Sequence, residues 1–394
     1  MKQKQKLTHS RFLIPGIILL GIVLRAPFTT LSTVLSDIAS GLGVEVSSLG
    51  LLTSLPLLTF AIFSPFAASW AKRFGIERLF LGVLIVMTLG SALRTFNLPL
   101  LYVGTILVGA GIAFINVLLP SLIQANQPGR LGFLTTLYIT SMGLSTAVAS
   151  SVAVPITKAT SWQGLVWVLT AVCALALVIW LPNVGHNHYL EQGTSTRENS
   201  GSWYKSGKVW AIMIFGGLQS LFFYTTITWL PTMATQAGVG KVNAGILASV
   251  FTLTSIPFSM IVPSLITKLS NRNRHVMLVT TILAGLVGVA MLLVNTNNFV
   301  YWLVLNLLIG SSASVLFPYM MVVFSMKASS PEKTAQLSGL AQTGGYVFAA
   351  LGPVLFGSSK DLFNSWTPAV LILLVLTLIM GIALYKVEKT DVIL

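Results

Sequence analysis

Long apolar runs recur along the whole 394-residue chain, and they decide what it can fold into. Asp, Glu, Lys and Arg make up only 8% of the residues, compared with about 25% in a typical soluble domain. The runs lack the alternating pattern of membrane barrel strands, so we interpret them as helices. An all-α membrane protein with twelve transmembrane helices is therefore predicted, at residues 12–37, 46–70, 78–96, 99–125, 130–158, 162–182, 207–236, 242–267, 275–295, 298–326, 333–359 and 363–386.

The net charge of +14 predicts the orientation of these helices. In a soluble protein such a charge would suggest nucleic-acid binding, but here the Lys and Arg residues fall in the short segments between apolar runs. We expect the basic N-terminal segment to be retained with helix 1 rather than cleaved as a signal peptide, because its apolar run is too long. Placing both termini in the cytoplasm puts most Lys and Arg residues inside; those left outside are Arg94, Lys158, Lys241 and Lys360.

The chain divides into two similar halves. The longest hydrophilic stretch, residues 183–206, predicts a cytoplasmic linker between an N-terminal six-helix bundle at 1–182 and a C-terminal one at 207–394. Its two histidines, His186 and His188, are more simply interpreted as solvated than as metal ligands. Matching prolines at nearly constant offsets, about 200 residues apart, predict two pseudo-symmetric parallel repeats with a substrate site between them near the bilayer midplane.

Prolines within the apolar runs free backbone carbonyls and permit helix bends. Each bend is either a static kink or part of a gate, and the sequence leaves both readings open. The candidate gating prolines are Pro27, Pro120, Pro155, Pro231, Pro318 and Pro353.

Arg25 is the charged residue that lies deepest in a predicted helix, about midway between Arg11 and Asp37. A charge there costs at least about 2.5–3.5 kcal/mol, and such residues usually face a cavity. No nearby intramembrane carboxylate is available as an ion-pair partner. We therefore expect Arg25 to bind the anionic part of a substrate, the alternative being capture by helix carbonyls or by hydroxyls such as Thr29.

A second group of polar residues lies within the predicted helices. Amides and phenols can hydrogen-bond a small polar solute, or they can simply hold helices together. As candidate substrate-binding residues beside Arg25 we take Asn116, Gln219, Tyr224, Trp229, Tyr319, Gln342 and Tyr346.

The sequence offers little for enzymatic chemistry. No paired carboxylates, no nucleophile with a base and no phosphate loop occupy a plausible place, and no His, Asp or Glu falls in the interior of a predicted span. The single cysteine, Cys173, excludes an intrachain disulfide and a multi-cysteine metal site. We predict that the protein is not an enzyme and uses no cofactor or metal.

Two sets of motifs resemble known transporters. The segment ASWAKRFGIER at residues 68–78 is similar to the loop motif of the major facilitator superfamily, with Arg73 and Gly75 in place but Lys72 where the family has Asp. The segments GIVLRAPFTT (21–30), LLTSLP (51–56), GAGIAFINVLLP (109–120), WLP (229–231), QTGGY (342–346) and GP (352–353) resemble the cyanate permease and 2-nitroimidazole transporter family within it. One departure is Val23, where that family often carries Asn.

This resemblance implies a secondary transporter that moves a small anionic or polar solute across the cytoplasmic membrane by alternating access. It also implies a monomer, with Arg73 and Gly75 in the conformational machinery. Expected partners are the small solute and the lipid bilayer, without nucleic acid. The alternative is an exporter of amphipathic drugs or toxic compounds, which the largely apolar interior would suit; a non-transporting scaffold would require a soluble appendage that the sequence lacks.

Overall fold

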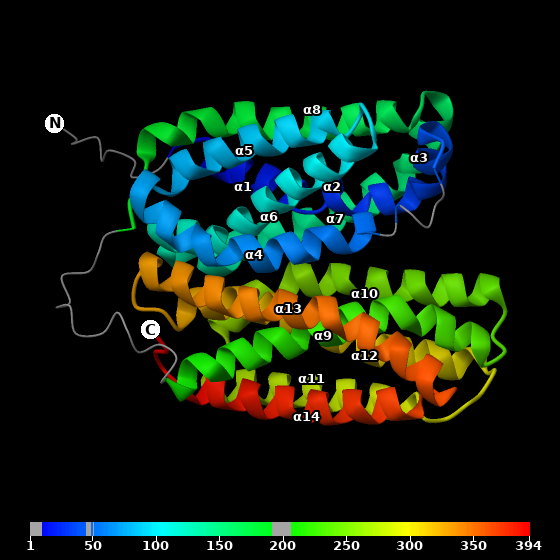
Figure 1. Cartoon of the computed structure of the whole chain (residues 1–394). Coiled ribbons are helices and arrows are strands. Elements are labelled where there is room, and N and C mark those ends of the chain that lie inside the picture. The colour runs from blue at the N-terminus through cyan, green and yellow to red at the C-terminus, as the bar shows by residue number, and fades with distance from the viewer. Residues whose placement is uncertain (1–9, 45–48, 50, 191–205) are drawn as a thin grey trace. The chain divides into compact units, whose positions relative to one another are not determined.

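The computed structural model describes residues 10–44, 49, 51–190 and 206–394, and throughout this part of the chain the regular elements are helices. The N-terminal residues 1–9 and most of the predicted linker, residues 191–205, lie outside the described residues. The first half contains α1 (Leu13–Val23), α2 (Ala26–Thr29), η1 (Leu31–Val34), α3 (Leu35–Leu42), α4 (Leu51–Phe74), α5 (Ile76–Leu93), α6 (Leu98–Asn126), η3 (Pro128–Arg130), α7 (Leu131–Ala159), α8 (Trp162–Trp180) and η4 (Leu181–His186) (Figure 1).

Among the described residues, the second half contains six long helices and no short ones. They are α9 (Gly207–Gln236), α10 (Lys241–Lys268), α11 (Asn271–Met291), α12 (Phe299–Met326), α13 (Pro331–Phe363) and α14 (Thr367–Lys389).

The spans fit the thickness of a bilayer. Eleven helices or helix series in the described chain are long and apolar enough to cross a membrane, with Leu13–Leu42 counting as one. The twelfth, α4, has 24 residues and is therefore about 36 Å long, which exceeds the roughly 30 Å of a hydrocarbon core. The predicted twelve-helix, all-α membrane fold is confirmed.

Polar residues just before several helices explain where those helices begin. The side chain of Asn97 accepts a hydrogen bond from the Leu100 amide at the start of α6, and Ser161 does the same for Gly164 in α8. In the second half, Asn298 caps α12 in this way. These side chains satisfy amides that lack an intrahelical partner at a helix start.

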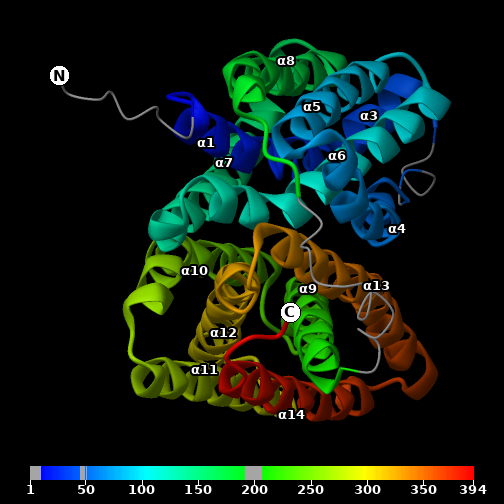
Figure 2. The same ribbon diagram turned by 90° about the vertical axis from the view of Figure 1, so that its left-hand side faces the viewer.

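The chain forms two compact units. The N-terminal unit contains α1 to α8 together with Ser330–Gly339, which includes the first turns of α13; the C-terminal unit contains α9 to α12, the rest of α13 and α14. The same pattern of helix contacts occurs within each unit. The pairs α4–α6, α5–α6 and α5–α8 of the N-terminal unit correspond to α10–α12, α11–α12 and α11–α14 of the C-terminal unit. Within the C-terminal unit, α11 and α14 run side by side (Figures 1 and 2).

Close helix approach within each unit depends on small residues. A methyl group at Gly21 of α1 would lie 2.6 Å from the Tyr138 carbonyl oxygen of α7. In the C-terminal unit, a methyl group at Gly345 of α13 would lie 3.3 Å from the Gly216 carbonyl oxygen of α9. These glycines thus let the first and fifth membrane helices of each half pack closely.

Candidate substrate site and the buried charges around it

Helix 1 is interrupted at Arg25. The helix α1 ends at Val23, α2 starts at Ala26, and Arg25 between them has φ −124° and ψ −52°. The break falls just before Pro27, which has no amide hydrogen to continue the helical pattern. The Arg25 carbonyl oxygen accepts hydrogen bonds from the amide and hydroxyl of Thr29.

Arg25 is half-buried, and its guanidinium makes no hydrogen bond or ion pair with the described residues. Thr29, the hydroxyl considered as an alternative partner, instead donates to the Arg25 backbone at 3.0 Å. Phe28, the third residue of α2, makes an edge-to-face contact with Phe60 of α4 at 5.8 Å between ring centroids. The Arg25 guanidinium and the Phe28 ring are therefore only three residues apart in sequence at the helix break.

A second arginine, Arg94, donates a hydrogen bond to the backbone at the same helix break. Arg94 follows α5 and is 1% exposed, and its Nη1 donates to the Pro27 carbonyl oxygen at 2.7 Å. Its Nε has no hydrogen-bond partner in the described structure. Gly104 of α6 leaves room for the Arg94 stem, because a methyl group there would lie 2.8 Å from Arg94 Cγ.

The structure adds a buried cation that the sequence analysis did not single out. From the charge distribution we expected Arg94 only to lie on the outer side, and its side chain is buried against the Pro27 carbonyl oxygen. The structure buries Arg94 because the interrupted first helix presents a carbonyl oxygen that needs a donor. Neither the break nor the side chain that reaches it can be located from the sequence around Arg94 alone.

Two further candidates of the N-terminal unit lie on α6. Asn116 and Pro120 are one turn apart, and both are buried. Asn116 is 8% exposed, and its amide interacts within the protein. Pro155, on α7, is exposed.

In the C-terminal unit, the amide candidates lie on two helices that pack closely. Gln219 of α9 is 2% exposed, and its Oε1 accepts no hydrogen bond from the described residues. Gln342 and Tyr346 of α13 are also buried, and the Tyr346 hydroxyl lies 3.3 Å from Gln342 Oε1. Gly345 allows this part of α13 to approach α9. Three predicted residues are thus brought to one helix pair.

The aromatic candidates on α9 have different surroundings. Tyr224 is half-buried against Phe223, with 5.2 Å between the ring centroids. Trp229 donates from Nε1 to the Pro353 carbonyl oxygen at 2.8 Å and packs against Gly357, where an added methyl group would touch the indole. The polar atom of Trp229 is therefore already used within the protein.

Tyr319 of α12 lies in a buried ion cluster. Its hydroxyl donates to Glu388 Oε2 at 2.6 Å, and Arg274 Nε donates to Glu388 Oε1 at 2.5 Å. Lys327 Nζ donates to the Glu388 carbonyl oxygen at 3.1 Å. These residues come from α12, α11, α14 and the segment after α12, and they fix one end of the C-terminal unit.

This cluster also corrects the sequence analysis, which left all carboxylates outside the spans. Glu388 falls within α14 and is 9% exposed, while Glu77 falls within α5 and is 1% exposed. The helices extend beyond the apolar runs that predicted them, and tertiary pairing compensates the buried charge.

The motif around Arg73 and Gly75 ends α4 and starts α5. Gly75 has φ +80°, and a methyl group there would lie 2.1 Å from Asn187, so both backbone and space require glycine. Arg73 lies over the Phe74 ring. Lys72 stands where the family has Asp, and it pairs with Glu332 in the first turn of α13. The residue at this position therefore contributes a positive charge instead of a negative one.

The start of the predicted linker is attached to this loop. Glu77 accepts hydrogen bonds from the His188 amide at 2.6 Å and contacts His188 Nδ1 at 2.7 Å. The Ile76 amide donates to the His188 carbonyl oxygen at 2.9 Å. The hydrogen bond to Glu77 raises the pKa of His188, against the opposing effect of burial. His188 is thus paired with a buried carboxylate, contrary to the expectation of a solvated side chain.

The described residues contain no group of three or more His, Cys, Asp or Glu side chains placed to hold a metal ion.

The remaining candidate prolines lie inside helices that continue through them: Pro231 in α9, Pro318 in α12 and Pro353 in α13.

Comparison with known proteins agrees with this architecture. The sequence profile of the Major Facilitator Superfamily matches residues 17–353 and, in a second match, residues 212–392. The chain belongs to this superfamily. It is a multi-pass membrane protein of a transporter family, and proteins of this family carry small solutes across lipid bilayers rather than catalyse reactions.

Relatives refine that assignment. The chain is 34% identical to the uncharacterized transporter YycB of Bacillus subtilis, covering 96% of this chain and 94% of that protein. It is 33% identical to the 2-nitroimidazole transporter of Escherichia coli over 94% and 93%. It is 23% identical to the cyanate transport protein CynX of E. coli over 89% and 90%. These relatives confirm the family that the sequence motifs resembled.

The fold is also that of a solved transporter. The E. coli fucose:proton symporter FucP has a TM-score of 0.74 with 13% sequence identity, covering 96% of this chain and 99% of that one.

Proposed function

We propose that the protein transports a small anionic solute by alternating access, and that Arg25 binds the negative group of the substrate. One observation carries this proposal: Arg25 is half-buried at a helix break, and its guanidinium has no partner in the described structure. A guanidinium at membrane depth needs compensation, and a planar anion matches its fork of donors.

Arg94 strengthens the preference for an anion. It is a second buried cation beside the same break, and in the described structure it is compensated by a carbonyl oxygen rather than by a carboxylate. Two arginines without carboxylates make the local potential positive. A cationic substrate would be repelled there.

The remaining candidates take different roles in this proposal. Asn116, Gln219, Tyr224, Gln342 and Tyr346 are the candidates to hydrogen-bond the rest of the solute. Trp229 and Tyr319 support helix packing, because their polar atoms already have partners. The six prolines, Arg73 and Gly75 belong to the conformational change.

The negative charge of the proposed substrate limits the modes of transport. An inside-negative potential opposes anion entry by about 2.3 kcal/mol per charge per 100 mV. Glu77 and Glu388 are already hydrogen-bonded, which makes them poor proton carriers. We therefore favour export, anion exchange or movement with a substrate-borne proton. With the basic helix ends in the cytoplasm, both termini face the cytoplasm. The family resemblance supports a monomer.

An exporter of amphipathic compounds is the competing function. The name of one relative, a 2-nitroimidazole transporter, and the aromatic pair Phe28–Phe60 beside the break favour planar, uncharged solutes. In that case, Arg25 would serve only the architecture of helix 1.

A thermal-shift screen of the purified protein separates the two functions. The panel contains cyanate, bicarbonate, nitrate and short carboxylates on one side, and neutral or cationic amphipaths on the other. A ligand at a hundredfold excess over its Kd stabilises the fold by about 2.7 kcal/mol. We expect an anion to raise the Tm of the wild type and not that of Arg25→Ala. Stabilisation by amphipaths alone, unchanged in Arg25→Ala, would establish the exporter instead.

A further inference from the structure

A groove lies between α11 and α14 on the C-terminal unit, and none of the candidate residues for solute transport lines it, although Tyr319 contacts one lining residue, Glu388. Its volume is about 310 Å³, and its lining is almost entirely apolar. Leu278, Ile282 and Leu384 are buried at its floor, and more exposed side chains such as Leu283 and Ile382 form its walls. It is a concave, apolar surface between two membrane helices.

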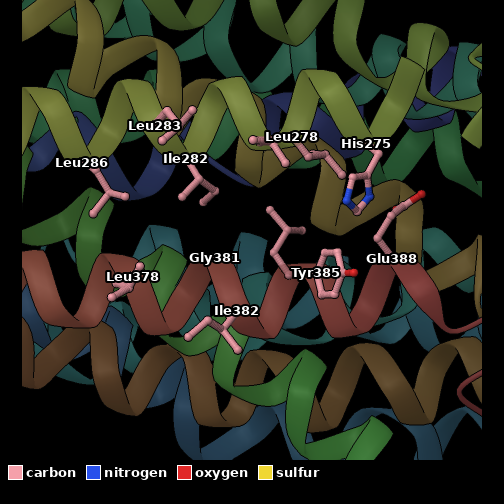
Figure 3. Close-up of a pocket in the computed structure, with 12 residues that line it drawn as sticks. His275, Leu278, Ile282, Leu283, Leu286, Leu378, Gly381, Ile382, Tyr385 and Glu388 are labelled. Carbon is pink, nitrogen blue, oxygen red and sulfur yellow. The ribbon is translucent and has the colours of Figure 1, made fainter. Parts of the chain in front are cut away.

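The groove has one polar end. His275, Tyr385 and Glu388 lie at that end, and Leu286 and Leu378 lie at the other (Figure 3). The rings of His275 and Tyr385 contact each other edge to face at 5.1 Å. The groove therefore has the polarity of an amphipathic molecule with a single head.

The length of the groove matches one leaflet. From His275 to Leu286, the helix rises about 16 Å at 1.5 Å per residue. Half of a bilayer hydrocarbon core is about 15 Å. An acyl chain that follows the groove would thus reach from the headgroup level to the bilayer midplane.

The charge at the polar end is positive. Glu388 is neutralised by Arg274, with which it forms a 2.5 Å hydrogen bond. Arg272 is exposed one turn before His275 on α11, on the groove side by helical spacing. On α14, Lys389 lies over the Tyr385 ring at 4.6 Å, with Lys386 exposed beside it. The nearest further carboxylate in sequence, Asp391, follows the end of α14.

From these observations we infer that the groove is a binding site for an anionic phospholipid, which places one acyl chain between α11 and α14 and its phosphate among Arg272, Lys386 and Lys389. An apolar groove one leaflet long accommodates the acyl chain. Cations at its polar end, which form no ion pair with the described residues, can bind the phosphate. If the basic helix ends are cytoplasmic, the lipid comes from the cytoplasmic leaflet. This site is independent of the solute that the protein carries.

Native mass spectrometry of the full-length, detergent-purified protein tests the proposal. The protein is titrated with palmitoyl-oleoyl phosphatidylglycerol or with the phosphatidylcholine of the same chains. We expect one phosphatidylglycerol to be retained at least about fivefold more than phosphatidylcholine. Glycerophosphoglycerol, which has the headgroup without chains, should not displace it. Equal retention of the two lipids, or displacement by the free headgroup, would overturn the proposal.

Matched variants locate the site. Leu283→Trp fills the groove, and Leu175→Trp on α8 is its control, because these two leucines are 53% and 52% exposed. We expect the first to reduce phosphatidylglycerol retention at least about fivefold and the second to leave it unchanged. Ile382→Trp provides a second groove variant if Leu283→Trp is not monodisperse. Arg272→Gln combined with Lys389→Gln should abolish the preference for the anionic lipid. Unchanged retention in both groove variants would refute this location.

Discussion

The first membrane helices of the two units carry proline at matching positions, but only one of the two helices is interrupted there. In the N-terminal unit the helix breaks at Arg25, before Pro27. In the C-terminal unit α9 continues through Pro231 for 30 residues, and Trp229, which corresponds to Arg25, donates a hydrogen bond to Pro353. The same proline therefore yields a packed helix in one unit and an open break with an unpartnered cation in the other.

Buried charge differs between the units in the same sense. Arg274 in the C-terminal unit is paired with Glu388. Arg94 in the N-terminal unit has a carbonyl partner only, in the described structure. The buried arginine of the C-terminal unit is thus compensated by a carboxylate, whereas the two arginines at the helix break of the N-terminal unit have no carboxylate partner in the described structure.

The largest expected effect is on the stability of the C-terminal unit. Arg274→Met leaves Glu388 buried without its cation, which typically costs about 3–5 kcal/mol. Thermal unfolding should therefore move to a clearly lower temperature. The double variant Arg274→Met/Glu388→Leu should recover most of the loss. If the single variant unfolds like the wild type, this pair is not what holds α11 to α14.

The next effect is on transport. Arg25→Ala should lower solute flux into proteoliposomes at least about a hundredfold, equivalent to about 2.7 kcal/mol, with little change in Tm. Arg25→Lys should keep only part of the activity, because an ammonium lacks the planar fork. Trp229→Phe is the matched control, and its loss should stay below about tenfold. Equal losses in Arg25→Ala and Trp229→Phe would remove the contrast between the units.

A smaller loss is expected from Arg94→Met. The variant leaves the Pro27 carbonyl without its donor and reduces the positive potential at the break, so flux should fall about tenfold. Arg94→Lys should restore part of the flux by keeping the charge. The comparison would fail if Arg94→Met transported normally.

The smallest effect concerns the His188 contact with Glu77. The pKa of His188 is raised in the folded protein, so protonated His188 stabilises the contact fully below its ordinary pKa of about 6.5, and this contribution is lost as the pH rises through the raised value. Hydrogen exchange of the Ile76 amide, corrected for its intrinsic rate, should show protection falling with pH. In His188→Gln the dependence should flatten. A steeper fall in that variant would contradict the assignment.

The sequence predicts the spans well because burial in lipid demands long apolar runs, and α9 and α12 lie within a residue of their predicted bounds. It also singles out Arg25, because an intramembrane charge is conspicuous in an apolar run. It does not place Arg94, Glu388 or His188, because each owes its position to a partner about 70 to 115 residues away in the chain. Such pairings depend on packing rather than on local pattern.

The candidate site divides in the same way. The amides Gln219 and Gln342 are predicted from their polarity alone, and the structure buries both. Tyr319 is predicted on the same grounds, but it contacts Glu388, a residue that the sequence assigns to the cytoplasm. Polarity identifies residues with something to bind, but only the fold shows whether the partner is internal.

The central claim is that Arg25 supplies the charge that recognises the substrate. The most direct test is equilibrium binding of the anion that stabilises the wild type, measured calorimetrically on the wild type, Arg25→Ala and Trp229→Phe. The account predicts a Kd at least about a hundredfold weaker in Arg25→Ala and nearly unchanged in Trp229→Phe. An anion that binds Arg25→Ala as tightly as the wild type would contradict it.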